Sequence, residues 1–478
     1  MNSDTLPPEP ALLERLRSAV GDDGVFTDPD RFLVYESDGL TQYRHPPSAV
    51  VLPRTAEELG RVVRVLHEAG RPFVGRGAGT GLSGGALAVR GAVVVGTSRM
   101  NRILELDPVN RRARVQAGVI NAALTAAARP YGLIYAPDPS SQSACTLGGN
   151  VAENSGGPHC LKYGVTNRYV TGLTVVLPDG EIAELGGMGR EDGGLDLVGV
   201  FVGSEGCFGI AAEIEVALVP APLGVRTLLA IFETPADAGR AVTRIMARGL
   251  LPAALEIIDS ATIRAVEASI FAAGYPTDAG AALVVEFDGV EEGLDREIEI
   301  AAECCSAAGA REVRTAADEE DRQGLWRGRK KAFGAMGRLA PDLLVQDATV
   351  PRTRLPDVLS RIAEIAARYE LQVANVFHAG DGNLHPNFLF DRRDPDQVRR
   401  VEAASGEIMA CCIEAGGTIT GEHGVGLDKR KYMPMVCSSD VLVTMAGVKA
   451  AFDPWGRCNP GKVLPDGIGP RHQGAGRR

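Results

Sequence analysis

The sequence predicts an α+β protein with two domains, on the basis of its length, its glycine content and a change of pattern near residue 220. The chain has 478 residues, which is enough for two or three domains with cores of their own. It contains 58 glycines, which indicate many turns or binding sites lined by backbone. Before residue 220 short strands alternate with glycine-rich loops, whereas strands and helices alternate regularly after the PAPL segment (220–223).

The first domain is expected to span residues 1–220. The segment 11–20 predicts a short helix, and Thr55, with Glu58 three residues later, predicts the start of a second helix that ends at Gly70. Short apolar runs predict the strands of this domain. These strands lie at 49–53, 71–74, 91–95, 109–119 and 171–185, the last with a hairpin at 178–180.

The second domain is expected to span residues 221–465. Its predicted elements are strand 225–231, helix 235–249, strand 254–258, helix 260–270, strand 282–288 and helix 291–308. This order is typical of an antiparallel sheet with helices packed on one face. The last part of the domain, 417–465, is expected to pack back on the first domain. The Gly- and Arg-rich residues 466–478 are expected to be a disordered tail.

Charge and hydropathy exclude several classes of protein. The formal net charge of −11 does not suit a nucleic-acid binder, which needs a basic face. No apolar run approaches the length of a membrane span, and the N-terminus has no signal-peptide pattern. The nine cysteines include no CxxC, so we expect reduced thiols in a cytoplasmic protein and no four-cysteine iron–sulfur cluster.

Three glycine-rich stretches favour a large, flat, phosphate-bearing cofactor. The first contains GTGLSG (79–84), which matches G-x-G-x-x-G. A Rossmann site is excluded, because only ALAVR separates this loop from the next strand and a crossover helix needs more residues. Exposed N–H groups on such a loop suit a pyrophosphate, and a hairpin loop without a ligand is the alternative. The other two stretches are 144–157 and 203–210.

These stretches resemble the FAD domain of the vanillyl-alcohol-oxidase/PCMH flavoproteins. The residues that carry the resemblance are PFVGRGAGTGLSGGA (72–86), a segment from PDPSSQSACTLGGN (137–150) to residue 180, and VGSEGCFGI (202–210). It extends over about residues 30–465 and is closest to the family's glycolate dehydrogenases, with D-lactate and D-2-hydroxyglutarate dehydrogenases more distant. It implies a PCMH-type FAD-binding fold followed by a substrate (cap) domain.

The resemblance also implies which residues hold the FAD. Thr80 stands where some relatives bind FAD covalently through a histidine, so non-covalent FAD is implied. The first loop would hold the pyrophosphate, the second would line the ribityl chain and the ring, and the third would touch the adenine side. The implied residues are Arg76, Gly77, Ala78, Gly79, Thr80, Gly81, Leu82, Ser83, Gly84 and Gly85; Pro137, Asp138, Thr146, Gly148, Gly149, Asn150, Asn154 and Gly157; and Gly209 and Ile210.

Two of the seven histidines of the chain bracket HAGDGNLH (378–385). Asp381-Gly382 predicts a two-residue type I′ turn. Such a turn pairs His378 directly with His385 on one sheet face, with Cβ atoms about 4.5–5.5 Å apart, and Asn387 shares that face. This geometry suits two ligands of one metal ion. Two polar side chains on an exposed sheet face are the alternative.

The segment GGTITGEHGVG (416–426) offers a third ligand, Glu422, with His423 beside it, although a loop with a chance histidine is the alternative. The resemblance extends to HAGDGNLHPN (378–387) and EHG (422–424). It implies that His378, His385 and Glu422 bind a divalent metal, with zinc first and manganese or iron also suitable. It further implies His423 as the base. Arg329 would bind the substrate carboxylate, its alternative being a helix-surface charge, and Asn387 completes the catalytic set.

The expected reaction is oxidation of a small 2-hydroxy acid, with hydride transfer from Cα to FAD N5. A metal would lower the pKa of the hydroxyl group and a neutral histidine would take its proton. Relatives that take 2-hydroxyglutarate carry a lysine where this chain has Leu344, Val345 and Gln346. The expected substrate is therefore a monocarboxylate, glycolate first and D-lactate second.

Two other classes of function remain as alternatives to a 2-hydroxy-acid dehydrogenase. An NADPH-dependent reductase on the same fold would not need the two histidines and the glutamate. A binding or structural module in which a zinc ion only stabilises the hairpin would need four protein ligands, and only three are apparent. The resemblance implies a second flavin-domain subunit and an iron–sulfur subunit as partners, which would place the chain in the cytoplasm or peripherally at the inner membrane.

Overall fold

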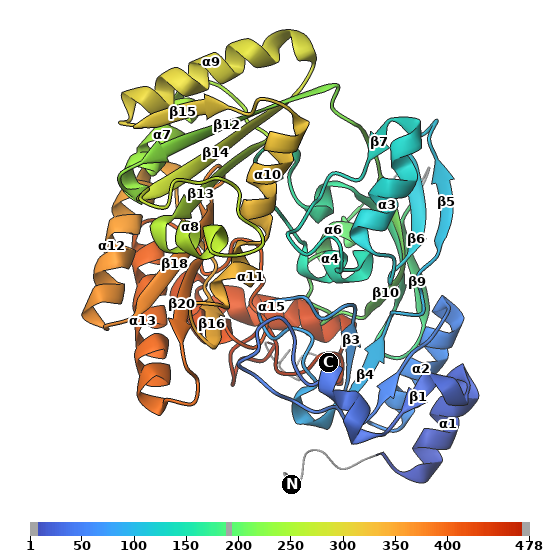
Figure 1. Cartoon of the computed structure of the whole chain (residues 1–478). Coiled ribbons are helices and arrows are strands. Elements are labelled where there is room, and N and C mark those ends of the chain that lie inside the picture. Colours follow the sequence, from blue (N-terminus) through green and yellow to red (C-terminus); the bar gives the residue numbers. More distant parts are fainter. Residues whose placement is uncertain (1–7, 188–193, 471–478) are drawn as a thin grey trace. The chain divides into compact units, whose positions relative to one another are not determined.

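The computed structural model describes residues 8–187 and 194–470 (Figure 1). The chain forms two compact units. The first unit comprises Met1–Ser155, Val165–Ala221 and His423–Arg478, and the second comprises Gly156–Gly164 and Pro222–Glu422. The compact units thus collect segments from distant parts of the chain, and the boundaries expected from the sequence stay a prediction. Among the described residues, no helix combines the length and the apolarity that crossing a bilayer requires.

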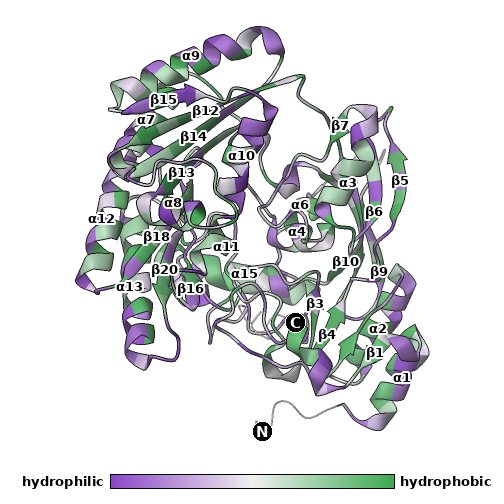
Figure 2. Ribbon diagram, viewed as in Figure 1, coloured by the Kyte–Doolittle hydropathy of each residue, from purple (hydrophilic) through white to green (hydrophobic). Residues whose placement is uncertain are grey.

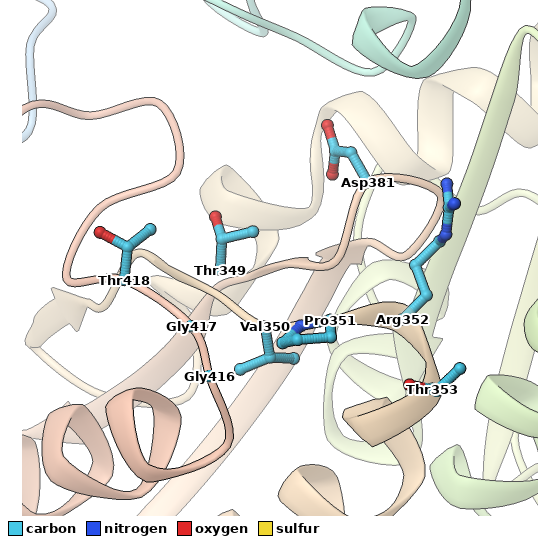
Figure 3. A pocket seen from close by; sticks show the side chains of 9 residues that line it. All are labelled: Thr349, Val350, Pro351, Arg352, Thr353, Asp381, Gly416, Gly417 and Thr418. Carbon is cyan, nitrogen blue, oxygen red and sulfur yellow. The ribbon is translucent and has the colours of Figure 1, made fainter.

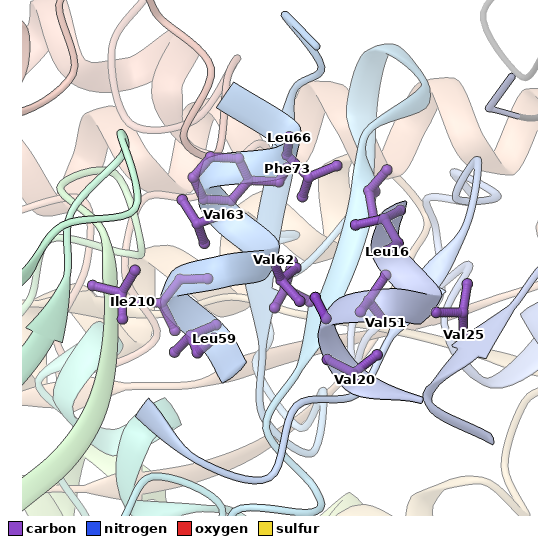
Figure 4. Close-up of a cluster of buried hydrophobic side chains, with 14 of the residues drawn as sticks. Leu16, Val20, Val25, Val51, Leu59, Val62, Val63, Leu66, Phe73 and Ile210 are labelled. Carbon is purple, nitrogen blue, oxygen red and sulfur yellow. The ribbon is translucent and has the colours of Figure 1, made fainter. Parts of the chain in front are cut away.

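The first unit contains a four-stranded sheet covered by helices near the N-terminus. The sheet order is β1 (Val25–Phe26), β2 (Val50–Val51), β4 (Val93–Gly96) and β3 (Phe73–Arg76). The helices are α1 (Pro10–Val20) and α2 (Ala56–Glu68), and Thr55 caps α2 by accepting a hydrogen bond of 3.2 Å from the Glu58 amide, as the sequence predicts. Side chains from these elements and from Ile210 form one buried apolar cluster (Figure 4).

The loop from β3 to β4 carries the first glycine stretch. The two strands are parallel neighbours, and Phe73 pairs with Val93. The connection contains only a 3₁₀ turn, η4 (Val89–Gly91), and no α-helix. The prediction that this loop lacks a Rossmann crossover helix is therefore confirmed.

Five further strands of the first unit form an antiparallel sheet. Its order is β5 (Ile103–Asp107), β6 (Arg112–Gln116), β10 (Ile210–Ala217), β8 (Val170–Val176) and β9 (Ile182–Gly186). The predicted hairpin over 171–185 is the β8–β9 pair. A two-stranded piece joins β7 (Leu133–Ile134) to β11 (Val219–Pro220). The other helices of this unit are α3 (Asn121–Ala128), α4 (Leu147–Glu153), α6 (Leu197–Phe201), α14 (Met433–Val436) and α15 (Ser439–Phe452).

The predicted disordered tail lies partly outside the described residues, since residues 471–478 are not described. At its beginning, Asp466 accepts two hydrogen bonds from the Arg430 guanidinium, at 2.8 and 2.9 Å. The first residues after the predicted boundary are therefore tied to the first unit.

The second unit contains a large antiparallel sheet. Its path is β15 (Glu312–Thr315), β12 (Gly224–Phe232), β14 (Ala281–Gly289), β13 (Ala254–Asp259), β18 (Gln372–His378), β19 (Asn383–Leu384) and β17 (Ala348–Thr349), and β20 (Pro386–Phe390) joins β18 to β16 (Asp342–Val345). Its helices are α5 (Cys160–Tyr163), α7 (Pro235–Ala247), α8 (Ser260–Glu267), α9 (Glu291–Ala307), α10 (Glu319–Lys330), α11 (Ala332–Met336), α12 (Leu355–Arg368) and α13 (Pro395–Glu414). The predicted alternation over 225–308 is confirmed.

The expectation that helices cover one face of this sheet is wrong. Leu229, Ile231 and Ile258 share a buried cluster with side chains of α8, α10 and α11. Leu228 and Leu283 point to the opposite face and are equally buried, and α7 and α9 pack against β12 and β14. The central strands are continuously apolar (Figure 2), which is the pattern of a sheet buried on both faces.

The histidine hairpin has a different register from the predicted one. His378 pairs with Asn383 instead of His385, because the loop comprises four residues, 379–382. A type I′ turn needs positive φ at both central residues, but only Gly382 has it, at +82°. The register is shifted by two residues, and side chains alternate with a period of two, so both histidines still lie on one face. Their ring centroids are 5.2 Å apart.

We predict that Gly382→Ala destabilises the second unit more than Gly274→Ala does. Both glycines have positive φ, at +82° and +78°, so alanine costs each about 1–2 kcal/mol of backbone energy. Only at Gly382 would the new Cβ also overlap a backbone atom, the carbonyl oxygen of Val350, whereas nothing lies within 4 Å at Gly274. Chemical denaturation of both variants measures the difference, and equal midpoints would contradict this register.

Candidate active site

The first glycine loop is shaped by Arg76, which is itself buried. Its Nη2 donates to the carbonyl oxygens of Val34 at 2.9 Å and Ser37 at 2.8 Å. A Cβ at Gly79 would overlap the same guanidinium group, so the loop folds tightly over it. Arg76 therefore holds the loop from beneath. Whether the loop binds a pyrophosphate stays a prediction.

The second glycine stretch folds against the first within the same unit. Thr146 caps α4 by accepting a hydrogen bond from the Gly149 amide at 3.2 Å. A Cβ at Gly77 would overlap Thr146 Oγ1, so the two loops touch. Asn150 accepts a hydrogen bond of 3.0 Å from Asn121 Nδ2. Asn121 is buried and was not among the residues predicted from the sequence.

The structure thus brings most of the predicted cofactor residues together in the first unit. Asn121 Nδ2 also donates to the Pro137 carbonyl at 3.0 Å, which joins the 137–138 segment to α4. The third stretch belongs to the same unit. It ends with Gly209, whose φ is +140°, and Ile210, which is the first residue of β10. Gly157 is the exception, because it belongs to the second unit. Because glycine has no side chain, the glycines of these stretches leave the backbone accessible to a flat ligand.

The two hairpin histidines and Glu422 converge in the second unit. Glu422 Oε1 lies 3.2 Å from His378 Nε2 and 3.2 Å from His385 Nε2. His378 and His385 are almost fully buried, at 4% and 1% exposure, which excludes the alternative of polar side chains on an exposed face. The three atoms form a compact set of two nitrogens and one oxygen.

The other ring nitrogens show which atoms are free to bind a cation. His378 Nδ1 lies 2.8 Å from Glu256 Oε1, and His385 Nδ1 lies 3.2 Å from the Gln346 carbonyl oxygen. Both of these oxygen atoms accept hydrogen bonds, which favours a proton on each Nδ1 and leaves each Nε2 to face Glu422. Three electron-rich atoms at this separation require a positive charge between them. The donor set fits a divalent metal ion.

The charges of the site agree with this requirement. Burial would lower the pKa of His378, but the Glu256 and Glu422 carboxylates raise it well above its usual range. Burial would likewise raise the pKa of Glu422, but the charge and hydrogen bond of His378, together with His385, hold it well below its usual range. The site therefore stabilises a cation, whether a proton or a metal ion.

Asp347 fixes the loop that carries Glu422. This carboxylate is fully buried and accepts hydrogen bonds from the amides of Gly421 at 3.0 Å and Glu422 at 3.2 Å, and from Thr420 Oγ1 at 2.5 Å. Asp347 directly follows Gln346, whose carbonyl oxygen lies 3.2 Å from His385 Nδ1. One short segment therefore orients a histidine and the glutamate.

Arg329 is not a helix-surface charge, since its exposure is 1%. Its Nε and Nη2 both approach Glu256 Oε2 at 2.5 Å, and Nη2 lies 3.4 Å from His378 Nδ1. Glu256 stands directly opposite His378 in the β13–β18 ladder. Glu256 was not among the residues predicted from the sequence, although a glutamate inside the apolar strand 254–259 is a signal that points to it.

Asn387 and His423 have different surroundings. Asn387 is fully buried, and its Nδ2 donates to the carbonyl oxygens of Ala374 at 2.9 Å and His385 at 2.7 Å. It therefore supports the strand of His385. His423 directly follows Glu422 and begins the last segment of the first unit. Their catalytic roles stay predictions.

A pocket of about 550 Å³ lies beside the hairpin turn (Figure 3). Its walls are the segments 349–353, 416–418 and the turn residue Asp381. The Arg352 side chain points along one wall, and its Nη1 donates to the Gly380 carbonyl at 3.1 Å. Asp381 lies in the turn between His378 and His385, and the segment 416–418 precedes Glu422 by a few residues.

Comparison with known proteins agrees with this organisation. A family model described as "FAD binding domain" matches residues 47–186, and a model described as "FAD linked oxidases, C-terminal domain" matches residues 222–463. The chain is 47% identical to the glycolate oxidase subunit GlcD of Escherichia coli (strain K12), over 95% of this chain and 91% of that protein. It is 44% identical to the subunit of the same name from Bacillus subtilis, over 90% and 92% of the two chains.

A D-lactate dehydrogenase of Anaerostipes hadrus is 35% identical, over 87% of this chain and 89% of that protein. Among solved structures, p-cresol methylhydroxylase with substrate bound superposes with a TM-score of 0.79 at 18% identity, covering 96% of this chain and 98% of the other. A 4-ethylphenol oxidase from Gulosibacter chungangensis gives 0.79 at 20% identity, covering 98% and 99%. The predicted PCMH-type fold with a second domain is confirmed.

We predict that Glu256→Gln destabilises the second unit by about 3–5 kcal/mol, because it leaves Arg329 as a buried charge without its carboxylate. The double variant Glu256→Gln/Arg329→Met removes both charges and is expected to recover much of this loss. Urea denaturation of the single and double variants measures both effects. A single variant as stable as the parent chain would show that the ion pair is dispensable.

Proposed function

We propose that this chain, which belongs to the family of FAD-linked oxidases, oxidises a small 2-hydroxy acid. Membership of the family makes the chain a flavin-dependent oxidoreductase. Glycolate, oxidised to glyoxylate, is the first substrate proposed and D-lactate the alternative, because relatives named for both are similar over most of the chain. The observation that carries the proposal is the convergence of His378, His385 and Glu422 on one point.

The proposed cofactors are non-covalent FAD and one divalent metal ion. FAD, when bound, supplies the acceptor of the two electrons that leave Cα of the substrate. The metal, when bound, supplies a positive charge that lowers the pKa of the substrate hydroxyl group. Two imidazole nitrogens and one carboxylate oxygen suit zinc, and manganese or iron also fits. Three protein ligands leave room for a substrate, unlike a closed structural site.

The protein groups around these cofactors would orient the substrate and move one proton. His423 is proposed as the base that takes the hydroxyl proton, since a neutral imidazole does so near pH 7. Arg329 is proposed to face the substrate carboxylate through Nη1, because its Nε and Nη2 are directed to Glu256. Asn387 is proposed to keep His385 in place through the hydrogen bond to its carbonyl oxygen.

The size of the substrate is proposed from the end of β16. Leu344 and Val345 are apolar and buried there, and Gln346 Nε2 donates to Ser405 Oγ at 2.5 Å. None of the three offers a cation to a second substrate carboxylate. Burial of an unpaired carboxylate is unfavourable, which favours monocarboxylates over 2-hydroxyglutarate.

Partner subunits are proposed as the route for the electrons. The relatives from Escherichia coli and Bacillus subtilis are named as subunits, which supports an assembly. A second flavin-domain subunit and an iron–sulfur subunit would accept electrons, and the chain would then act in the cytoplasm or at the inner membrane through them.

Anaerobic bleaching of the flavin tests the substrate. We expect glycolate, and D-lactate more slowly, to bleach the visible flavin absorption of the purified protein. D-2-hydroxyglutarate is expected to leave it unchanged over the same time, because no cation meets its second carboxylate. L-Lactate serves as the stereochemical control. Robust bleaching by 2-hydroxyglutarate would refute the proposed substrate class, and no bleaching by any of the four acids would refute the proposed reaction.

We predict that His423→Asn lowers the rate constant of flavin reduction by about 10²–10⁴-fold, the usual contribution of a positioned base. FAD content, measured from the visible spectrum, is expected to stay that of the parent chain. His67→Asn, in helix α2 of the first unit, is the matched control and is expected to reduce its flavin normally. A His423 variant that reduces its flavin at the normal rate would remove this residue from the mechanism.

A further inference from the structure

We propose that Glu205 is a positioning residue for His423, and that it acts by clamping the backbone of the two residues Val425 and Gly426. The inference rests on the proposed function, since it concerns the proposed base. It goes beyond that function because Glu205 belongs to the third glycine stretch, for which the family resemblance implied only a contact on the adenine side. All residues of the clamp belong to the first unit.

The contact consists of two charge-assisted hydrogen bonds. Glu205 Oε1 accepts from the Val425 amide at 2.7 Å, and Oε2 accepts from the Gly426 amide at 2.6 Å. Both oxygens of one buried carboxylate thus hold consecutive amides that begin two residues after His423. Hydrogen bonds to an ionised acceptor are about twice as strong as neutral ones. The contact therefore fixes the path of the chain directly after the proposed base.

The backbone of Glu205 is itself held in an unusual conformation. Its φ is +50°, in the left-handed region that residues other than glycine rarely adopt. The Glu205 amide donates to the Ala152 carbonyl at 2.8 Å, and its carbonyl accepts from Asn459 Nδ2 at 2.7 Å. Such a conformation persists only where the surroundings enforce it, and it is frequent at functional sites.

A second carboxyl group, that of Glu153, meets the same point of the chain. A Cβ at Gly424 would lie 2.6 Å from Glu153 Oε2 and 2.9 Å from Glu205 Oε1. Gly424 has φ of +83°, so both space and conformation require glycine next to His423. Burial and the charge of Glu205 raise the pKa of Glu153 well above its usual range. Burial also raises the pKa of Glu205, but the Val425 and Gly426 amides oppose that rise, so Glu205 is the carboxyl group of the two that these contacts favour as ionised.

The clamp is also tied to the first glycine loop. Ser83 accepts hydrogen bonds from the amides of Leu427 at 2.9 Å and Asp428 at 3.1 Å through its carbonyl oxygen. Asn459 Nδ2, which holds the Glu205 carbonyl, also donates to the Gly85 carbonyl at 3.0 Å. The segment after His423 is therefore fixed to the loop predicted to hold the FAD pyrophosphate, which couples the position of the base to the cofactor loop.

Glu205→Gln tests the clamp in the FAD-loaded protein. The amide nitrogen of glutamine cannot accept a hydrogen bond, so one of the two backbone amides loses its acceptor. We expect amide hydrogen exchange in peptides covering 421–429 to become at least about fivefold faster, because one amide donor loses its acceptor. Glu105→Gln, at an exposed position of β5, is the control and is expected to leave exchange in this segment unchanged.

Kinetics separate positioning from simple stabilisation. We expect Glu205→Gln to slow flavin reduction at saturating substrate by about tenfold or more, with FAD content and melting temperature close to those of the control. A parallel loss of FAD, melting temperature and rate would mean a merely structural role and would overturn the proposal. So would unchanged exchange over 421–429, or faster exchange with a normal rate of flavin reduction.

Glu205→Asp keeps the test decisive if the glutamine variant does not fold. It retains the charge and both acceptor oxygens on a shorter side chain, and an intermediate rise in exchange over 421–429 is expected. Exchange identical to that of the parent chain would overturn the clamp. If no 2-hydroxy acid reduces the flavin of the parent protein, the proposed function fails separately, and the exchange measurement still decides whether the clamp exists.

Discussion

The site in the second unit is organised by one electrostatic constraint: two buried imidazole nitrogens, each 3.2 Å from the same carboxylate oxygen, need a positive charge between them and that oxygen. The surrounding hydrogen bonds orient both Nε2 atoms toward Glu422. Glu256 and the Gln346 carbonyl hold the Nδ1 atoms, and Asp347 holds the loop of Glu422. These partners leave the ligands little freedom to turn away, which is how a metal site is preorganised.

The same constraint explains why a buried Arg329–Glu256 pair persists in an apolar sheet. An isolated buried carboxylate would be costly, but Glu256 is shared between an arginine and a histidine. Its remaining charge adds to the demand for a cation at His378. The first unit has a different requirement, because the flat, phosphate-bearing ligand proposed for it must reach the backbone. Its glycine loops meet that need by removing side chains, and Arg76, Thr146 and Asn150 brace them from behind.

Much of the fold was predictable because its signals are local. The helix capped by Thr55 and the strand–helix alternation of the second unit follow from capping residues and periodicity. The coverage of both sheet faces was missed, although the unbroken apolar run of β14 is its signature. The hairpin register was missed for another reason. Asp381 does not adopt the positive φ of a type I′ turn, and tertiary contacts around Val350 and Gly382 set the loop length.

The candidate site was predictable to the extent that its motifs are contiguous. HAGDGNLH and EHG supply the three candidate ligands and the proposed base, and an even register shift kept both histidines on one face. Glu256 and Glu205 were not predicted as site residues, because each acts through a contact far along the sequence. Glu256 meets His378 across a strand pair, and Glu205 meets Val425 across more than two hundred residues. Only the folded chain shows such partners.

The most direct test is the metal content of the purified protein, measured by mass spectrometry for the parent chain and for His385→Ala, with FAD content measured in parallel. The account predicts about one divalent ion per chain in the parent protein, and loss of that ion in the variant with the flavin retained. A parent protein that is reduced by its substrate at full rate without bound metal would contradict the account. So would a variant that keeps its metal.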